Sequence, residues 1–254
     1  MKKANYQQIA KTWDKAHPLY DATLELYLKL VANRVGHRNQ IKLLDLGCGT
    51  GRFAIPFANQ SGYSVTAIDN SKEMIEKARQ KDTDSRVDWR VQDVTNLEIA
   101  DSSFDVIFMS NLLHHLDNPY ALIQKCFHIL SLDGVIVNRY GALEHQRHDP
   151  EHKFFPEVVK IDELRCPSIK QVEAWFQNAS FARVQSETVI QPTYTSSKDR
   201  LSSVKLKRTS VLTLISQHEF EEGLESFKKY VSENPLDSWL LNDYITITTG
   251  YKIK

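Results

Sequence analysis

The chain has 254 residues, which suits one α/β domain, and 41% of them are hydrophobic, which is enough for a sizeable core. No apolar run approaches the roughly 18 residues of a membrane span, and the N-terminus lacks the apolar stretch of a secretory signal, so we expect a soluble, cytoplasmic protein. Lys and Arg total 32, and Asp and Glu also total 32. The overall charge therefore does not favour polyanions such as nucleic acids.

The first part of the chain has a helical pattern that gives way to alternating elements. Apolar residues recur at spacings of three to five up to about Gly36, and we expect Pro18 to divide this stretch into two helices. Short apolar runs and amphipathic segments then alternate, as is typical of βαβ units in a parallel sheet. The expected strands are 41–46, 63–68, 86–91 and 104–110, and the expected helices begin at Gly51 and span 71–81.

The second half of the chain continues this alternation and then departs from it. The expected elements are a helix near Pro119, a strand over 135–141, a helix near 168–179, and strands over 181–190 and 243–253. The stretch 141–157 is the least regular, and we predict a long functional or mobile loop there. Helical periodicity dominates 193–234, which predicts a helical insertion between the last two strands.

The strongest chemical signal is the segment LLDLGCGTG (43–51), an apolar strand that runs into a glycine-rich turn and then a helix. Glycines are used at such turns because the backbone must bend sharply and approach a ligand closely. A tight structural turn is the alternative explanation. A dinucleotide fingerprint requires a third glycine or alanine where this chain has Arg52, so the pattern does not favour a nicotinamide cofactor.

Four motifs follow one another in the first half of the chain: LLDLGCGTG (43–51), VTAIDNS (65–71), QDVTNL (92–97) and FDVIFMSNLLHHL (104–116). This series resembles the ordered motifs of class I S-adenosylmethionine-dependent methyltransferases of the bacterial small-molecule type. The resemblance implies a Rossmann-like α/β fold, with a doubly wound seven-stranded sheet of order 3-2-1-4-5-7-6 whose last strand is antiparallel. It also implies S-adenosylmethionine as the cofactor.

We expect a single methyltransferase domain over 1–254. In it, 1–36 form an N-terminal helical cap, 41–192 and 242–254 form the Rossmann-like core, and 193–234 form a helical lid insertion. The apolar residues of the insertion are spaced for helices with one buried face, and the nearest available surface is at the carboxyl ends of the parallel strands. We predict that the insertion shapes the acceptor pocket. Helices that extend the core or form an oligomer contact are the alternatives.

Two acidic residues at strand ends are candidates for binding the nucleoside. Asp69 ends its predicted strand 22 positions after Gly47, close to the spacing of about 20 at which an acidic residue meets ribose hydroxyls in doubly wound folds. A helix cap is the alternative role. The resemblance implies that Asp93 accepts a hydrogen bond from the adenine amino group and that the Val94 amide faces a ring nitrogen.

The methionine part of the cofactor must lie beside Gly47 and Gly49, where backbone amides and the positive end of the next helix favour its carboxylate. The resemblance implies that Asp45 orients the amino group and that the Ser110 carbonyl accepts from it. Tyr20 is a candidate for covering the methionine end, and a role as a core aromatic is the alternative. The remaining expected cofactor contacts are Cys48, Gly51 and Asn70.

His114 and His115 are the candidate catalytic residues. They follow the fourth predicted strand, where the methyl group should face the acceptor, and a histidine can take a proton near neutral pH. A base is optional, because methyl transfer from a sulfonium depends mainly on positioning. The alternative is that this pair binds only backbone groups.

Two further groups of residues invite other functions. His145, His148 and His152 are spaced for a metal, but they lie in a polar segment without a neighbouring cysteine, so we predict no metal site. A basic run could attract RNA, but such runs are usually solvated helix faces, and no aromatic residue is interleaved for stacking. The basic run consists of Lys198, Arg200, Lys205, Lys207 and Arg208.

We interpret the chain as a methyltransferase that transfers a methyl group to a small-molecule acceptor by in-line displacement. A tRNA-modifying methyltransferase and a non-catalytic S-adenosylmethionine-binding protein are the alternatives. A monomer and a dimer are equally compatible with the sequence.

Overall fold

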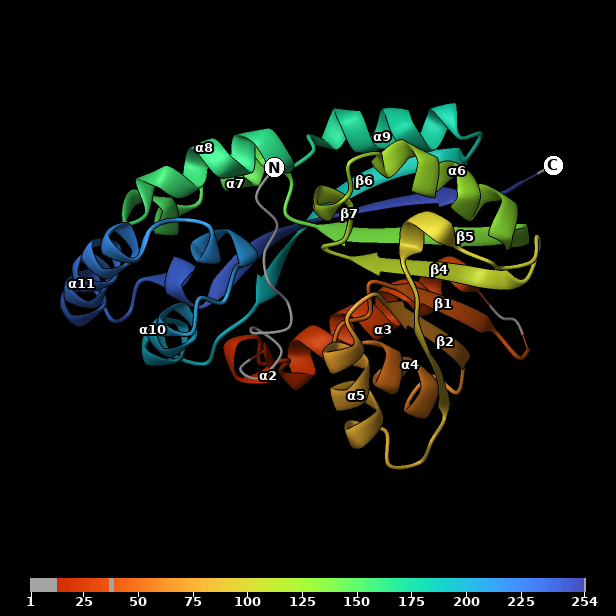
Figure 1. The fold of residues 1–254 in the computed structure, drawn as a ribbon, viewed down its shortest axis with the longest axis horizontal. Helices are drawn as coiled ribbons and strands as arrows, with labels where there is room; N and C mark the ends of the chain where they lie inside the picture. The colour runs from red at the N-terminus through yellow and green to blue at the C-terminus, as the bar shows by residue number, and fades with distance from the viewer. Residues whose placement is uncertain (1–12, 37–38, 254) are drawn as a thin grey trace.

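The protein is built around one seven-stranded sheet that carries helices on both faces (Figure 1). The computed structural model describes residues 13–36 and 39–253. Along the sheet the strands run in the order β3-β2-β1-β4-β5-β7-β6. The strands are β1 (Lys42–Leu46), β2 (Ser64–Asp69), β3 (Val87–Val91), β4 (Phe104–Ser110), β5 (Leu130–Tyr140), β6 (Ala182–Pro192) and β7 (Asn242–Tyr251). β7 pairs antiparallel with both β5 and β6, and the other pairs are parallel. The predicted strand order and the antiparallel last strand are therefore confirmed.

The central strands are apolar on both faces because helices cover both sides of the sheet. In β1, Leu43, Leu44 and Leu46 are fully buried, and the middle of β4 is buried in the same way. Parallel pairing brings the carboxyl ends of β1, β2 and β4 to one edge of the sheet. The chemistry-bearing motifs follow those ends, so they gather at this edge.

The helices next to the sheet divide into two groups, each with its own apolar core. One face is covered by α3 (Asp21–Val35), α4 (Ala54–Asn59) and α5 (Lys72–Lys81), and the other by α6 (Pro119–Ile129) and α9 (Ile169–Asn178). Several of these helices begin with a side-chain cap that satisfies free backbone amides. Ser71 accepts from the Met74 amide, and Asn118 precedes Pro119 and accepts from the Ala121 amide.

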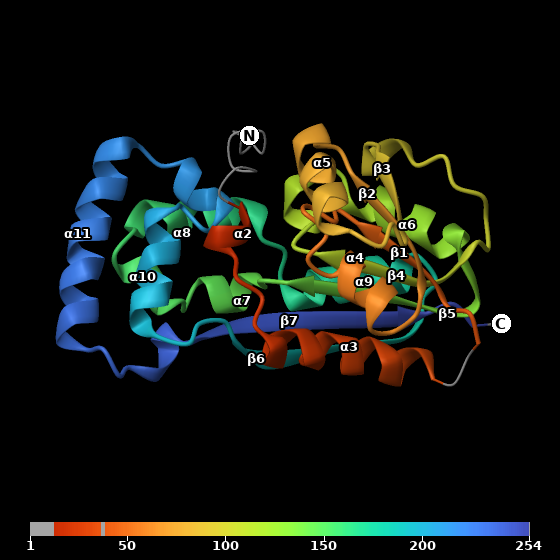
Figure 2. The same cartoon turned by 90° about the horizontal axis from the view of Figure 1, so that it is seen from below.

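The N-terminal segment forms two helices, as the position of Pro18 predicts. The short helix α2 (Trp13–Ala16) is separated from α3 by the loop that contains Pro18. The part of the predicted helical pattern before Trp13 lies outside the described residues. The Ser203 hydroxyl of α10 (Ser197–Lys205) donates to the Ala16 carbonyl, and Asp14 binds Lys81 of α5. Figure 2 accordingly shows α2 between α10 and α5.

The segment 141–157, predicted to be a loop, is largely helical. It contains α7 (Leu143–Gln146), the 3-10 turn η3 (Pro150–Lys153) and the start of α8 (Pro156–Arg165). The Asp149 carboxylate accepts from the Glu151 amide and so caps η3. The loop prediction was wrong because these short helices are held by tertiary packing, which local periodicity does not reveal.

The helical insertion between β6 and β7 is present, as predicted. After α10 come η4 (Ser210–Thr213), α11 (Gln217–Glu233) and η5 (Ser238–Leu240). Together with α8 they enclose a third apolar core, in which Phe155 stacks on Phe220 at a centroid distance of 5.9 Å. A Cβ at Gly223 would lie 2.4 Å from the Phe154 carbonyl oxygen, so α11 packs tightly on this segment. Figure 2 shows this helical group beyond one end of the sheet.

Within residues 13–36 and 39–253, no helix combines the length and the apolar character that crossing a membrane requires.

Candidate active site

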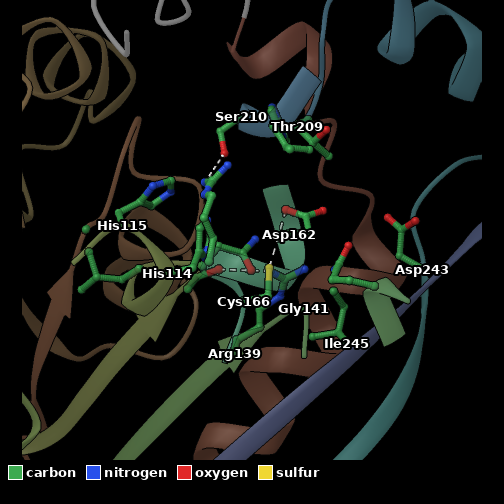
Figure 3. Close-up of a pocket in the computed structure, with 18 of the residues that line it drawn as sticks. His114, His115, Arg139, Gly141, Asp162, Cys166, Thr209, Ser210, Asp243 and Ile245 are labelled. Atoms are coloured by element: carbon green, nitrogen blue, oxygen red, sulfur yellow. Dashed lines mark hydrogen bonds between the residues drawn. The ribbon is translucent and has the colours of Figure 1, made fainter. Parts of the chain in front are cut away.

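A large cavity lies between the carboxyl ends of the parallel strands and the helical insertion (Figure 3). Its volume is about 1080 Å³. Pockets for one drug-sized ligand have volumes of about 300–1,000 Å³, so this cavity has room for a cofactor and a second molecule. Its wall includes the glycine loop, the ends of β4 and β5, parts of α8, and η4 of the insertion.

The glycine loop lies at one side of this cavity, and its glycines serve different purposes. Gly47, Gly49 and Gly51 have φ angles of 70°, 55° and 77°, a region that favours glycine. A Cβ at Gly47 would lie 2.9 Å from Leu112, and one at Gly51 would lie 2.4 Å from Trp89. At Gly49, among the residues that the structure describes, only the Trp13 ring would come within 4 Å of a Cβ. Gly51 does not line the cavity and permits packing on Trp89, whereas Gly47, Gly49 and the intervening Cys48 line it.

Asp69 and Asp93 both line the cavity and keep acceptor capacity for a ligand. Asp69 accepts from the Gly49 amide at 2.8 Å and the Ser71 amide at 2.9 Å, while burial raises its pKa. A carboxylate has about four acceptor sites, so two remain. One oxygen of Asp93 accepts from the amide and the hydroxyl of Thr95, each at 2.8 Å. Asn70, Val94 and Ser110 also line the cavity.

Asp45 is a buried carboxyl in the wall of the cavity, with 2% of its surface exposed. Across the described ranges 13–36 and 39–253, no hydrogen-bond donor reaches its carboxylate. Burial, with a further contribution from the charge of Asp69, raises its pKa to about 8. A buried carboxyl without a donor is costly. This position therefore suits a ligand that brings an ammonium group.

The two candidate catalytic histidines also line the cavity. They lie in η2 (Leu113–His115), directly after β4, and their rings are 3.9 Å apart. Burial lowers the pKa of His114 well below its ordinary value, and the charges of His115 and Arg165 lower it further. His114 is therefore neutral at physiological pH. Figure 3 shows both histidines on one side of the cavity and Asp243 and Ile245 on the other.

The N-terminal segment reaches the cavity through residues that the sequence analysis did not select. Tyr20 lies directly before α3 and does not line the cavity. Trp13 and His17 line it instead, and their rings stack at 3.9 Å. The position of Tyr20 gives no support to the role predicted for it. Trp13, an aromatic residue in the helical pattern before Tyr20, was the signal in the sequence that could have identified this contact.

Part of the basic run is buried, which corrects the expectation of a solvated helix face. Arg200 is 1% exposed and binds Glu151 at 2.9 Å and Asp243 at 3.1 Å. Arg208 binds the same two carboxylates at 3.1 and 3.3 Å. Glu151 comes from η3 and Asp243 from β7, so only the tertiary fold could reveal these partners. Lys198 and Lys205 are exposed.

Two of the three histidines considered as metal ligands contact different side chains. His145 lies 3.1 Å from the Thr188 hydroxyl, and His152 lies 3.6 Å from Asp162. In the part of the chain that the structure describes, no group of three or more His, Cys, Asp or Glu residues is placed to hold a metal ion.

Arg52 and Arg139 also line the cavity, and the sequence analysis assigned no role to either. Arg139 lies near the end of β5, and only 4% of its surface is exposed. A charged residue in the otherwise apolar segment GVIVNRY (134–140) was a signal that could have identified it.

The sheet has the Rossmann-like α/β topology, and its cavity lies at the carboxyl edge, where folds of this kind bind their ligands. Residues 44–138 match the family model described as a methyltransferase domain. This range contains the glycine loop, both nucleoside-side aspartates and the histidine pair.

Comparisons with known proteins also find similarity to methyltransferases. The chain is 28% identical to 27-O-demethylrifamycin SV methyltransferase from Amycolatopsis mediterranei, over 90% of this chain and 85% of that protein. It is 36% identical to the ubiquinone biosynthesis O-methyltransferase of Xanthomonas campestris, over 37% of this chain and only 41% of that relative. The Haemonchus contortus phosphoethanolamine N-methyltransferase 2, solved with S-adenosyl-L-methionine, superposes with a TM-score of 0.67 at 18% identity, covering 98% of this chain and 58% of that one.

The chain thus carries a methyltransferase domain and is similar in sequence and fold to known methyltransferases.

Proposed function

We propose that this enzyme methylates a hydroxyl group of a small-molecule acceptor by in-line displacement. The observation that carries the proposal is the single cavity of about 1080 Å³, which joins the glycine loop to the histidine pair under the helical insertion. Two of the relatives described above are named for O-methylation of small molecules or for a biosynthetic O-methyltransferase step. A cavity of this kind suits a compact acceptor better than a folded macromolecule.

The residues around the glycine loop fit the polar groups of S-adenosylmethionine. The free acceptor sites of Asp69 suit the ribose hydroxyls, and Asp93 and Val94 suit the adenine edge. The buried carboxyl of Asp45 suits the methionine ammonium group, which supplies the donor that it lacks. When bound, S-adenosylmethionine supplies a methyl group on a positively charged sulfur, and S-adenosylhomocysteine is the product.

We assign His114 the role of orienting the acceptor hydroxyl. Its imidazole is neutral because burial disfavours the charged form, so it can accept a hydrogen bond from a hydroxyl. The same low pKa makes it a weak proton acceptor, and a strong base is not needed because the methyl carbon is already activated. Positioning next to the cofactor is then the main contribution of the protein.

The buried arginines argue against RNA as the acceptor. Arg200 and Arg208 are held by Glu151 and Asp243, so these two cations are not available to phosphate groups. The exposed Lys198 and Lys205 and the half-buried Lys207 remain, and three lysines form a small electrostatic footprint.

The test is an acceptor screen in which S-adenosylhomocysteine formation is followed with purified enzyme. One arm offers hydroxyl-bearing small molecules, including phenols and polyketides, and the other offers bulk tRNA at 50 and 200 mM salt. We expect turnover with small hydroxylated acceptors and none with tRNA. Methylation of tRNA that falls steeply between the two salt concentrations would contradict the proposal.

A further inference from the structure

Two buried arginine side chains flank the Phe53 ring in the wall of the cavity. The guanidinium carbons of Arg52 and Arg139 lie 5.0 and 5.8 Å from the centroid of this ring. Arg52 directly follows the glycine loop, and Arg139 is paired in the sheet with Ser110 at the end of β4. Both side chains therefore lie beside the methionine end of the proposed cofactor site.

Neither arginine has a carboxylate partner among the residues that the structure describes. Arg139 donates to the Ser110 hydroxyl at 3.1 Å and to the Gln191 side-chain oxygen at 2.5 Å, and both acceptors are neutral. The Nε atoms of both arginines are buried without a hydrogen-bond partner. Asp14 is the one carboxylate whose charge acts appreciably on Arg52, and it already binds Lys81 at 3.0 Å.

The positive charge of Arg52 persists at neutral pH. Burial and the neighbouring charge of Arg139 lower the pKa of Arg52 only to about 10. His17 faces the same region and adds no further positive charge, because burial and Arg52 lower its pKa to about 3 and leave it neutral. Tyr27 lies beneath Arg139, and its hydroxyl donates to Gln191. The region thus holds two guanidinium groups and, within residues 13–36 and 39–253, no carboxylate that pairs with either of them.

The same protein pairs its other two buried arginines with carboxylates. Arg200 and Arg208 share the two carboxylates of Glu151 and Asp243. Removing charges from water without a partner is strongly unfavourable, so the absence of carboxylates around Arg52 and Arg139 indicates a partner that comes from outside the chain.

We infer that Arg52 and Arg139 form a subsite that binds a carboxylate group of a ligand in this cavity. The planar guanidinium group matches a carboxylate through two parallel hydrogen bonds, and such charge-assisted bonds are the stronger class. This inference deepens the proposed function and rests on the use of the cavity as the reaction site. The carboxylate has two possible sources, the methionine end of the cofactor and an acidic acceptor.

The surroundings complement an amino acid with both of its charges. Asp45 on β1 is a buried carboxyl without a donor, and Arg52 and Arg139 are guanidinium groups without an anion. All three line one cavity at the same edge of the sheet. A zwitterion carries an ammonium and a carboxylate next to each other, so it compensates both kinds of charge at once.

The test compares Arg52→Gln and Arg139→Gln with wild type and with Lys125→Gln, a control that removes a cavity-lining charge on α6. Calorimetry measures the binding of S-adenosylmethionine and of decarboxylated S-adenosylmethionine, which lacks only the carboxylate. Melting curves of the ligand-free variants verify folding. A second arm titrates succinate into each protein saturated with S-adenosylhomocysteine and follows the melting temperature. Because neither arm requires turnover, failure of the acceptor screen does not affect this test.

If the subsite binds the cofactor carboxylate, each arginine variant should bind S-adenosylmethionine about 10- to 100-fold more weakly than wild type does. Wild type and the arginine variants should bind the decarboxylated compound with equal affinity. If it binds an acceptor carboxylate, cofactor affinity should be unchanged, and succinate should stabilise wild type and Lys125→Gln but neither arginine variant. Equal losses for both cofactor forms would contradict the inference, as would wild-type behaviour of both arginine variants in both arms.

Discussion

Asp45 and Asp69 are neighbouring acidic residues, and the structure gives them different tasks. Asp69 accepts from the Gly49 and Ser71 amides, so it fixes the glycine loop as well as facing the cavity. Asp45 accepts no hydrogen bond from the described residues, and its burial disfavours the charged carboxylate. Stability lost at a binding residue of this kind is regained when the ligand arrives. Each residue therefore allows a distinct prediction.

Asp69→Asn should weaken binding of S-adenosylhomocysteine about 10- to 100-fold, because one acceptor oxygen is replaced by a donor that opposes a backbone amide. Calorimetry measures the effect. Asp88→Asn is the matched control, since Asp88 is an exposed residue of β3 whose ion-pair partner is Arg90. Equal affinities in wild type and Asp69→Asn would remove Asp69 from the site.

Asp45→Asn should stabilise the ligand-free protein and weaken cofactor binding. Burial raises the pKa of Asp45 from its ordinary 3.8 to about 8, so the folded state binds the proton more tightly than the unfolded state does. Wild-type stability attributable to this group is therefore present below about pH 4 and is lost as the pH rises to about 8. The melting temperature gained by Asp45→Asn should be larger at pH 8 than at pH 5. A gain that does not change with pH would contradict this assignment.

The helical insertion has two kinds of apolar residue, which the sequence pattern does not distinguish. Leu212 of η4 and Phe220 of α11 both belong to the third apolar core, but only Leu212 also lines the cavity, whereas Phe220 stacks on Phe155. The sequence predicted the helices and one buried face, but not that α8 would be their main partner. The segment 141–157 looked irregular, so its packing surface was missed.

Leu212→Ala should alter the KM for the acceptor and leave the affinity for S-adenosylhomocysteine within about twofold, because Leu212 lies on the insertion side of the cavity. Phe220→Leu is the structural control. It should lower the melting temperature without changing the KM of the acceptor. If cofactor affinity, acceptor KM and melting temperature changed in parallel in both variants, the insertion would be a purely structural element and not a lid.

At the scale of the whole molecule, periodicity predicted the strands of the sheet, whereas the strand order and the antiparallel β7 were implied by the resemblance to class I methyltransferases. The glycine loop, Asp69 and the histidine pair were found because local chemistry follows strand ends in this fold. Arg139, Trp13 and the partners of Arg200 were not found. Each of them depends on contacts between segments far apart in the chain, and sequence spacing carries no information on those contacts.

The measurement that tests the account most directly is ligand-dependent melting with S-adenosylhomocysteine, NAD and NADP. We predict that S-adenosylhomocysteine at 100 times its dissociation constant adds about 2.7 kcal/mol to the free energy of unfolding, while NAD and NADP add nothing. Asp45, Asp69 and Asp93 all line the cavity, and the proposed site uses them to bind the nucleoside and the ammonium group of S-adenosylmethionine. Stabilisation by NAD or NADP, with no response to S-adenosylhomocysteine, would contradict the account.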